Sequence, residues 1–156
     1  MTKLHHEVHI DAPVSAVWNV LADLEAVQYY NPLVAKATCT SENRQGVGAA
    51  RHCDFKPSGF SKEQVFEFQE GKALGIEVVN SSWPVTYCRW RTVLTPDGQG
   101  TLVSQDLEYA PKFGVLGKIM DAVAMRRKFN GILNDIFAGL KKYVESNARG
   151  SSSYDK

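Results

Sequence analysis

Residues 10–34, IDAPVSAVWNVLADLEAVQYYNPLV, decide the fold that we predict for this chain. Asp11 and Pro13 are typical of a helix start, where a carboxylate accepts hydrogen bonds from the first helical N–H groups and proline needs no partner. Asp23 indicates a second start of the same kind, and Pro32 ends the second helix. The stretch therefore predicts two short helices inserted between two strands.

The segments on either side of this insertion have different periods. Residues 4–10, LHHEVHI, alternate as a strand with one face inward. Residues 34–110 contain turn signals at NRQGVG, KPSG, EGKALG, NSSWP and TPDGQG, which leave room for six antiparallel strands. From about 115 to 146, apolar residues recur at helical spacing. The predicted class is α+β: a seven-stranded curved antiparallel sheet wrapped around a long C-terminal helix, with two short helices between the first two strands.

Size and charge limit the function. With 156 residues, 44% of them hydrophobic, we expect a single ligand-binding domain over residues 1–147 and a disordered tail over residues 148–156. The net charge of +1, from 18 basic and 17 acidic residues spread along the chain, predicts no nucleic-acid partner and no affinity for an anionic membrane.

Location and redox state follow from similar counts. The N-terminus has no apolar segment of secretory type, and no apolar run approaches the ~20 residues that span a bilayer, so we expect a cytoplasmic protein without stable membrane insertion. Cys39, Cys53 and Cys88 are odd in number and lack CxxC spacing, which predicts free thiols instead of a disulfide framework or a zinc site.

Four stretches resemble a known family: residues 10–34, GVGAAR, TPDGQGTLVSQ, and KFGVLGKIMDAVAMRRKFNGILNDIFAGLKKYVE. They are similar to the START-like superfamily, and more narrowly to its polyketide cyclase/dehydrase and lipid-transport branch, also called SRPBCC. The resemblance covers residues 4–146, and its most specific part is the DAPxxxVW segment that enters the first helix. It implies the helix-grip architecture shared with plant Bet v 1 proteins, in which the short helices close one end of a half-barrel.

A half-barrel of this kind predicts an interior that side chains need not fill. Tyr30 is expected at its rim and Phe113 at the opposite lip, where neighbouring glycines allow a gate to move. Apolar walls with a few polar groups describe a small-molecule pocket and a packed core equally well, and only volume separates the two. The candidate ligand-binding residues, from alternation, helical spacing and the rim argument, are Tyr30, Phe55, Phe66, Phe68, Trp90, Gln105, Tyr109, Phe113, Met120 and Val123.

Three residues are weak catalytic candidates. Arg51 and Glu63 lie opposite each other across the KPSG turn, and in the resembling branch an arginine and a glutamate at these places recur near the pocket. Strand parity opposes this, because an inward Phe66 and Phe68 turn Glu63 outward unless a bulge shifts the register. A solvated cross-strand pair is therefore the alternative. His6 is a candidate pocket acid or base, with a core or rim histidine as its alternative.

We expect neither a metal nor a cofactor. His5, Glu7 and His9 share a strand face but span roughly 13 Å at ~3.3 Å per residue, too far to meet one ion. The chain also contains neither a GxSxG motif nor a P-loop, so nucleophilic and nucleotide chemistry find no support.

Two functions follow from the interior. The first is binding or transport of a small hydrophobic molecule, such as a lipid, a polyketide or an aromatic compound, in an internal cavity. The alternative is a polyketide cyclase or dehydratase acting on a ligand held in the same cavity. A partner-binding domain with a filled core is a third, weaker hypothesis. The sequence leaves open whether the protein forms a homodimer.

Overall fold

A computed structural model describes residues 1–152 of the chain, without the side chains of Val123 and residues 150–152. Seven strands and the helices around them follow in the order predicted. They are β1 (Thr2–Ile10), α1 (Val14–Ala22), η1 (Leu24–Ala26), α2 (Val27–Tyr30), β2 (Val34–Cys39), β3 (Ala50–Phe55), β4 (Phe60–Gln69), β5 (Ala73–Ser81), β6 (Val85–Asp97), β7 (Gly100–Pro111), α3 (Gly114–Met120), η2 (Asp121–Met125) and α4 (Arg126–Ser152).

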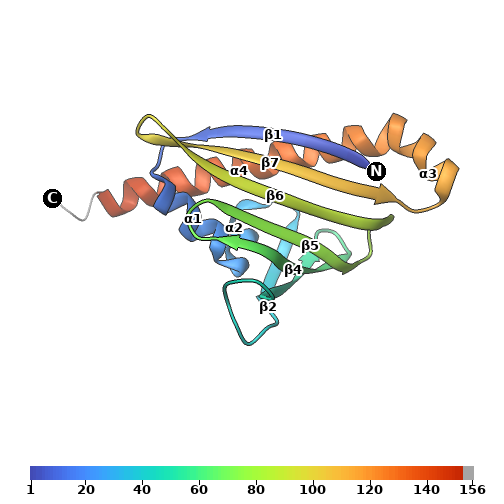
Figure 1. The fold of residues 1–156 in the computed structure, drawn as a ribbon, viewed down its shortest axis with the longest axis horizontal. Coiled ribbons are helices and arrows are strands. Elements are labelled where there is room, and N and C mark those ends of the chain that lie inside the picture. Colours follow the sequence, from blue (N-terminus) through green and yellow to red (C-terminus); the bar gives the residue numbers. More distant parts are fainter. Residues whose placement is uncertain (153–156) are drawn as a thin grey trace.

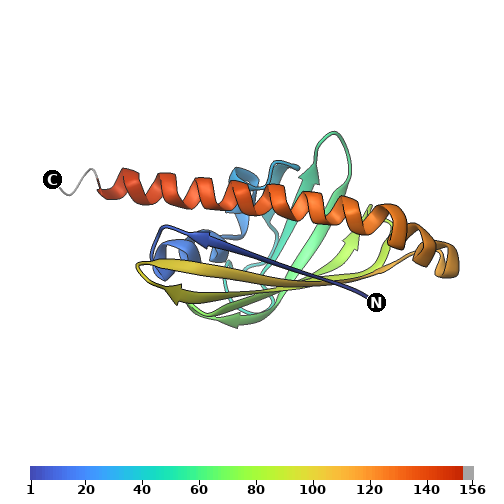
Figure 2. The same cartoon turned by 90° about the horizontal axis from the view of Figure 1, so that it is seen from above.

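The strands form one antiparallel sheet in the order β1-β7-β6-β5-β4-β3-β2, so that the first strand pairs with the last (Figure 1). Helix α4 runs along the length of the concave face, with α3 at one end of the molecule (Figure 2). Helices α1 and α2 follow β1 and precede β2, the two edge strands, in the sequence. In space they lie near the other end of the molecule and contact α4. The predicted α+β helix-grip architecture is confirmed.

Local chemistry explains most of the elements. In β1, Leu4 and Ile10 are buried while His5, Glu7 and His9 face outward, as strand alternation predicts. Asp23 caps η1 as expected, because its carboxylate accepts a hydrogen bond from the N–H of Glu25.

The predicted cap at Asp11 is wrong. Pro13 occupies the N-cap position of α1 and makes no side-chain capping bond. The N–H of Asp11 instead donates to the Glu145 carboxylate over 2.9 Å, which ties the chain ahead of α1 to the last helix.

The last helix departs from prediction in two ways. A turn of π-helix, η2, separates α3 from α4 and adds one residue to the helical period. Helix α4 then continues to Ser152, which includes residues 148–152 of the expected disordered tail, and residues 153–156 lie outside the described part.

Close packing holds α4 on the short helices. A Cβ atom added to Gly139 would lie 2.0 Å from the carbonyl oxygen of Tyr30, so the two backbones approach as closely as glycine allows. Trp18 packs edge-on against Phe68 with ring centroids 5.2 Å apart and fills this end of the core. Within residues 1–152, no helix is long and apolar enough to cross a bilayer.

Candidate ligand-binding site

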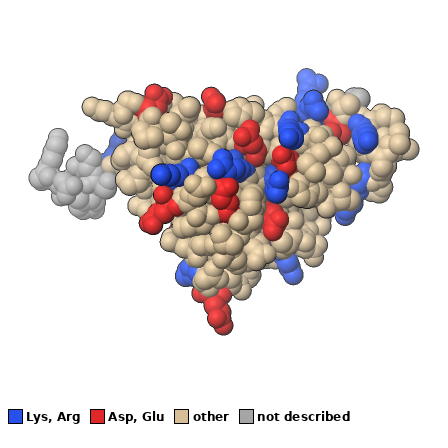
Figure 3. Space-filling view, in the orientation of Figure 1, with Lys and Arg blue, Asp and Glu red and all other residues tan. Residues whose placement is uncertain are grey.

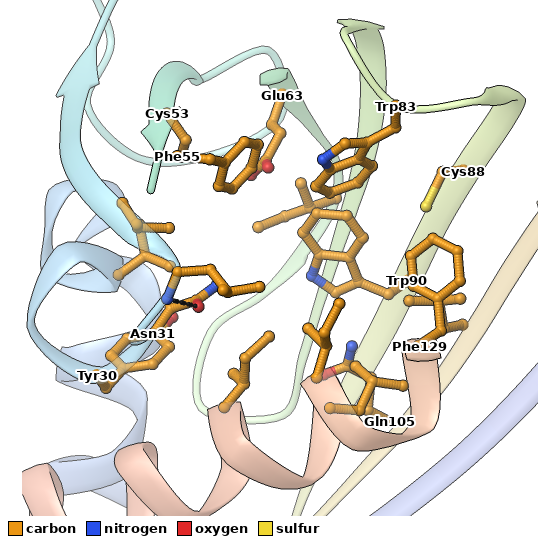
Figure 4. A pocket seen from close by; sticks show the side chains of 18 of the residues that line it. Tyr30, Asn31, Cys53, Phe55, Glu63, Trp83, Cys88, Trp90, Gln105 and Phe129 are labelled. Atoms are coloured by element: carbon orange, nitrogen blue, oxygen red, sulfur yellow. Dashed lines mark hydrogen bonds between the residues drawn. The ribbon is translucent and has the colours of Figure 1, made fainter. Parts of the chain in front are cut away.

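A cavity of about 500 Å³ lies between the concave face of the sheet and α4. This volume falls in the ~300–1,000 Å³ range of small-molecule sites. Figure 4 shows side chains from the sheet, from α2 and from α4 pointing into this space. Exposed residues of two turns and of α4, namely Lys56, Pro57, Ser82, Pro84 and Lys128, form part of the lining, so the cavity opens to solvent at this mouth.

Helix α4 supplies one wall. The residues that line the cavity from this side recur every three to four positions and are Met125, at the end of η2, and Lys128, Phe129, Ile132, Leu133, Ile136, Phe137 and Leu140 of α4. Most of them are apolar, and from Phe129 onward this agrees with the apolar residues that the sequence placed at helical spacing.

Aromatic rings border the mouth. The rings of Phe55 and Trp83 stack with centroids 5.2 Å apart, and Phe129 meets Trp83 edge-on at 6.4 Å. Trp83 comes from the turn between β5 and β6, which the sequence marked only as a turn. The available signal was a tryptophan inside a turn, a position that seldom suits so large an apolar ring unless it has a surface to cover.

A buried ion pair lies on the sheet side of the cavity. Arg51 and Glu63 are direct cross-strand partners on β3 and β4, and the Arg51 Nε donates to Glu63 Oε2 over 2.6 Å. Their side chains are 5% and 4% exposed. Ser61 donates to the other Glu63 oxygen over 2.6 Å, and Arg51 also donates to the Leu24 carbonyl over 3.1 Å. Both charges are therefore paired and hydrogen-bonded, as burial requires.

A β-bulge turns this pair inward. Glu63 pairs with Val78 and Val65 with Ile76, but the next pair is Glu67 with Gly75, which leaves Phe66 without a partner. The extra residue reverses the parity of β4, so Glu63, Val65 and Phe68 all face the interior. Of the two readings, the inward pair is confirmed and the solvated pair is wrong.

Charge and burial act on this group together. Burial alone lowers the pKa of Arg51, but Glu63, Cys53 and Tyr30 together more than offset this and the pKa is raised, so the guanidinium stays charged. Tyr30 lines the cavity beside this pair, and burial raises the pKa of its phenol. Cys53 and Cys88 also line the cavity, and burial raises the pKa of each thiol to about 12, which keeps both neutral.

Four predicted ligand-binding residues line the cavity: Tyr30, Phe55, Trp90 and Gln105. Tyr30 is buried, however, so the expected rim position is wrong for it. Its neighbour Tyr29 is 64% exposed but stacks on Tyr143 and does not line the cavity.

Phe68 and Tyr109 point inward without reaching the cavity. Phe68 packs on Trp18, and Tyr109 packs on Phe129 with ring centroids 4.7 Å apart while donating to the Asp121 carboxylate. Both are part of the wall behind the lining.

Three further assignments need correction or lie outside the described part. Bulged Phe66 faces outward, over the backbone of Gly75 and under the Arg89 guanidinium, 5.4 Å from its ring centroid. Met120 is 50% exposed, because the extra residue of the π-turn rotates the helix face ahead of Phe129. The side chain of Val123 lies outside the described residues.

Phe113 was predicted to line the lip, and it does not line the cavity. It precedes α3 in the left-handed conformation, with φ 76°, and is 70% exposed.

His6 does not reach the cavity either. Its Nε2 lies 3.1 Å from the Asn130 side-chain oxygen, and its ring packs near Phe137. Of the three catalytic candidates, only Arg51 and Glu63 therefore line the cavity. Among the described residues, no three His, Cys, Asp or Glu side chains gather as metal ligands do.

The fold and the hollow interior agree with a family model, described as polyketide cyclase / dehydrase and lipid transport, that matches residues 1–145. The chain belongs to this family. Among curated proteins, no sequence matches the chain. The polyketide cyclase/dehydrase and lipid transport family is thus assigned from a match over most of the chain, as the resemblance predicted.

Solved structures with low sequence identity share the fold. A Thermus thermophilus protein superposes with a TM-score of 0.80 at 17% identity, covering 94% of this chain and 99% of its own. A START superfamily protein from Mycobacterium smegmatis has a TM-score of 0.74 at 19% identity, covering 92% and 97%. The major latex-like protein of Panax ginseng has a TM-score of 0.75 at 12% identity, covering 91% and 96%.

Proposed function

We propose that the protein binds and carries a small hydrophobic molecule in the cavity between the sheet and α4. The observation that carries this proposal is an apolar hollow of about 500 Å³ with an opening to solvent. Transfer of an apolar ligand from water into such a space is favourable by ~25 cal/mol per Å² of ligand surface buried.

The ion pair suggests what else the ligand carries. The Arg51 guanidinium has five N–H donors, and its bonds to Glu63, Leu24 and the Tyr30 side chain engage three of them. A ligand oxygen that reaches the pair therefore meets a charged donor in an apolar surrounding, where such a bond is strong. We expect a mainly apolar ligand with one polar oxygen.

A carrier agrees better with this geometry than a cyclase or dehydratase. Both carboxylate oxygens of Glu63 already accept hydrogen bonds, from Arg51 and Ser61, and His6 lies outside the cavity. These bonds hold the pair in one geometry, which suits it to orient a ligand. Proton transfer needs an acid or base within hydrogen-bond reach of the reacting atom, and the candidate histidine does not reach the cavity.

A cavity-blocking variant tests the proposal. Ile132 lines the cavity and Asn134, two residues further along α4, is exposed, so Ile132→Trp fills the space while Asn134→Trp adds the same ring outside it. With N-phenylnaphthylamine as a fluorescent probe, we expect Ile132→Trp to weaken binding at least tenfold, because about 1.4 kcal/mol of apolar contact is enough for that change. Asn134→Trp should bind as the wild type does.

Two further measurements extend the test. Native mass spectrometry of the protein from its own host should reveal a co-purifying molecule, and a long-chain alcohol should displace the probe better than the matching alkane. Equal probe affinity in Ile132→Trp and Asn134→Trp, with no co-purifying molecule, would refute ligand binding in this cavity.

A further inference from the structure

Helix α3 exposes apolar side chains that the fold does not use. In Gly114–Met120 the buried residue is Gly117, where an added Cβ would lie 1.9 Å from the Lys112 carbonyl oxygen. The helix therefore packs through its glycine and turns its large side chains to solvent. We define the α3 patch as the apolar side chains exposed by 50–75% on and just before this helix: Phe113, Val115, Leu116, Ile119 and Met120.

The backbone at Phe113 supports a role outside the fold. Its φ of 76° lies in the left-handed region, which glycine and asparagine adopt readily and in which a bulky residue is strained. The ring is also 70% exposed, so its burial does not compensate that strain. Strain and exposure at one residue are typical of a functional surface.

Basic side chains surround the patch. Residues 112–130 contain five basic residues, Lys112, Lys118, Arg126, Arg127 and Lys128, and one acidic residue, Asp121, which gives this segment a charge of +4 and leaves −3 for the rest of a chain whose net charge is +1. All five are exposed. Figure 3 shows Lys and Arg gathered around the α3 end of this face.

The acidic residue of the segment is withdrawn from this surface. Asp121 is buried and accepts hydrogen bonds from the hydroxyls of Thr2 and Tyr109. Among the described residues, none of the five basic side chains forms an ion pair, whereas Arg89 and Arg91 on the outer face of the sheet pair with Glu108 and Glu67. The prediction of no anionic partner rested on net charge, which averages out this segregation.

The α3 patch adjoins the cavity mouth. The N–H of Lys112 donates to the carbonyl of Pro84, a mouth residue, over 3.0 Å. Met125 and Lys128, which line the cavity, follow one and two turns after α3. A surface that covers the patch therefore also faces the mouth.

We propose that the α3 patch docks the protein reversibly on an anionic lipid bilayer, with the apolar side chains in the interface and the basic side chains at the headgroups. Apolar residues ringed by lysine and arginine fit such a surface. A second copy of the chain fits worse, because a two-fold contact through this patch sets five basic residues against five. Transfer of a ligand between the bilayer and the cavity rests on the proposed function, whereas docking itself does not.

Vesicle sedimentation tests the docking. Wild-type protein should bind vesicles of phosphatidylglycerol and phosphatidylcholine in equal parts, should bind pure phosphatidylcholine much less, and should be released when salt rises from about 0.1 to about 1 M. Leu116→Ser with Ile119→Ser should lower binding at least tenfold through lost apolar contact. The matched control is Val47→Ser with Val79→Ser, which removes two exposed apolar side chains elsewhere and should bind normally.

Charge is tested in the same way. Lys118→Glu with Arg127→Glu should weaken binding by at least about twentyfold, at roughly fivefold per basic residue lost. Lys62→Glu with Lys72→Glu changes the net charge equally on exposed residues of another surface and should have a much smaller effect.

The outcomes separate docking from ligand binding. Leu116→Ser with Ile119→Ser should keep its affinity for N-phenylnaphthylamine, and Ile132→Trp should keep its affinity for vesicles. Equal binding to anionic and neutral vesicles, or equal loss in the matched controls, would overturn the docking surface. The docking surface would also be overturned if the wild-type protein did not bind vesicles but formed a dimer that Leu116→Ser with Ile119→Ser abolished.

Discussion

Removing one member of the Arg51–Glu63 pair should destabilise the protein far more than removing a surface pair. In Arg51→Met, the Glu63 carboxylate keeps its bond from Ser61 but remains 4% exposed without a positive partner. Breaking a buried pair in this way costs about 3–5 kcal/mol. At about 2–4 °C of Tm per kcal/mol for a chain of this size, the expected fall is roughly 6–20 °C.

The same sheet offers a matched control. Arg91 donates to both oxygens of Glu67 on β4, over 2.9 and 2.8 Å, but its side chain is 45% exposed. Solvent screens such a pair, so Arg91→Met should cost about 1 kcal/mol or less. The two variants differ in burial and not in the chemistry of the pair.

Differential scanning calorimetry and urea titration of both variants measure the difference. Arg51→Met with Glu63→Gln should lose much less than the sum of its single variants, because removing both members leaves no unpaired charge. If Arg51→Met loses no more stability than Arg91→Met, or if the double variant is additive, the pair is solvated and the reasoning fails.

Three other predictions concern packing, thiols and pH. Gly139→Ala should destabilise the protein by about 1–3 kcal/mol in urea titration, because the new Cβ meets the backbone carbonyl of Tyr30. Gly131 lies on the same helix with open space around it, so Gly131→Ala should stabilise the protein by up to about 1 kcal/mol. Similar effects of the two substitutions would contradict the packing described. Cys53, with a pKa of about 12, should have roughly a thousandfold less thiolate at pH 8 than an ordinary cysteine. Its labelling by iodoacetamide, followed by peptide mapping, should therefore be slow, and the labelling rate should rise throughout the alkaline range. Rapid labelling of Cys53 in the folded protein would contradict its burial. The hydrogen bond from Lys141 lowers the pKa of Glu145 below its ordinary value of 4.5. The ionised Glu145 therefore stabilises the folded protein above pH 4.5, and this contribution is lost as the pH falls through the pKa of Glu145 in the folded state. The urea midpoints of Glu145→Gln should approach those of the wild type in acid, and a difference that stays constant with pH would exclude this linkage.

Strand and helix positions were predictable because their signals are local. Alternation in β1 and the cap at Asp23 depend on residues a few positions apart, so the elements appear in the predicted order. Part of the site followed from the same alternation, which placed Phe55, Trp90 and Gln105 on the inner face.

The remaining site residues depend on two single-residue irregularities. The bulge at Phe66 sends Glu63 inward, and the π-turn ahead of α4 rotates Met120 to the surface. Each adds one residue to a regular period, and a prediction that assumes an unbroken period contains no signal of either. Periodicity in the sequence therefore assigns the residues on one side of such an irregularity to the wrong face of the strand or helix.

The sequence by itself determined the family, the order of elements and the apolar character of the interior, because these depend on composition and short-range spacing. Only the tertiary structure decided that the interior is hollow, that Arg51 and Glu63 meet inside it, and that α3 turns its apolar side chains outward among basic ones. Volume, pairing across strands and the grouping of charges on a surface are relations between segments far apart in the chain, and they exist only once the segments are packed.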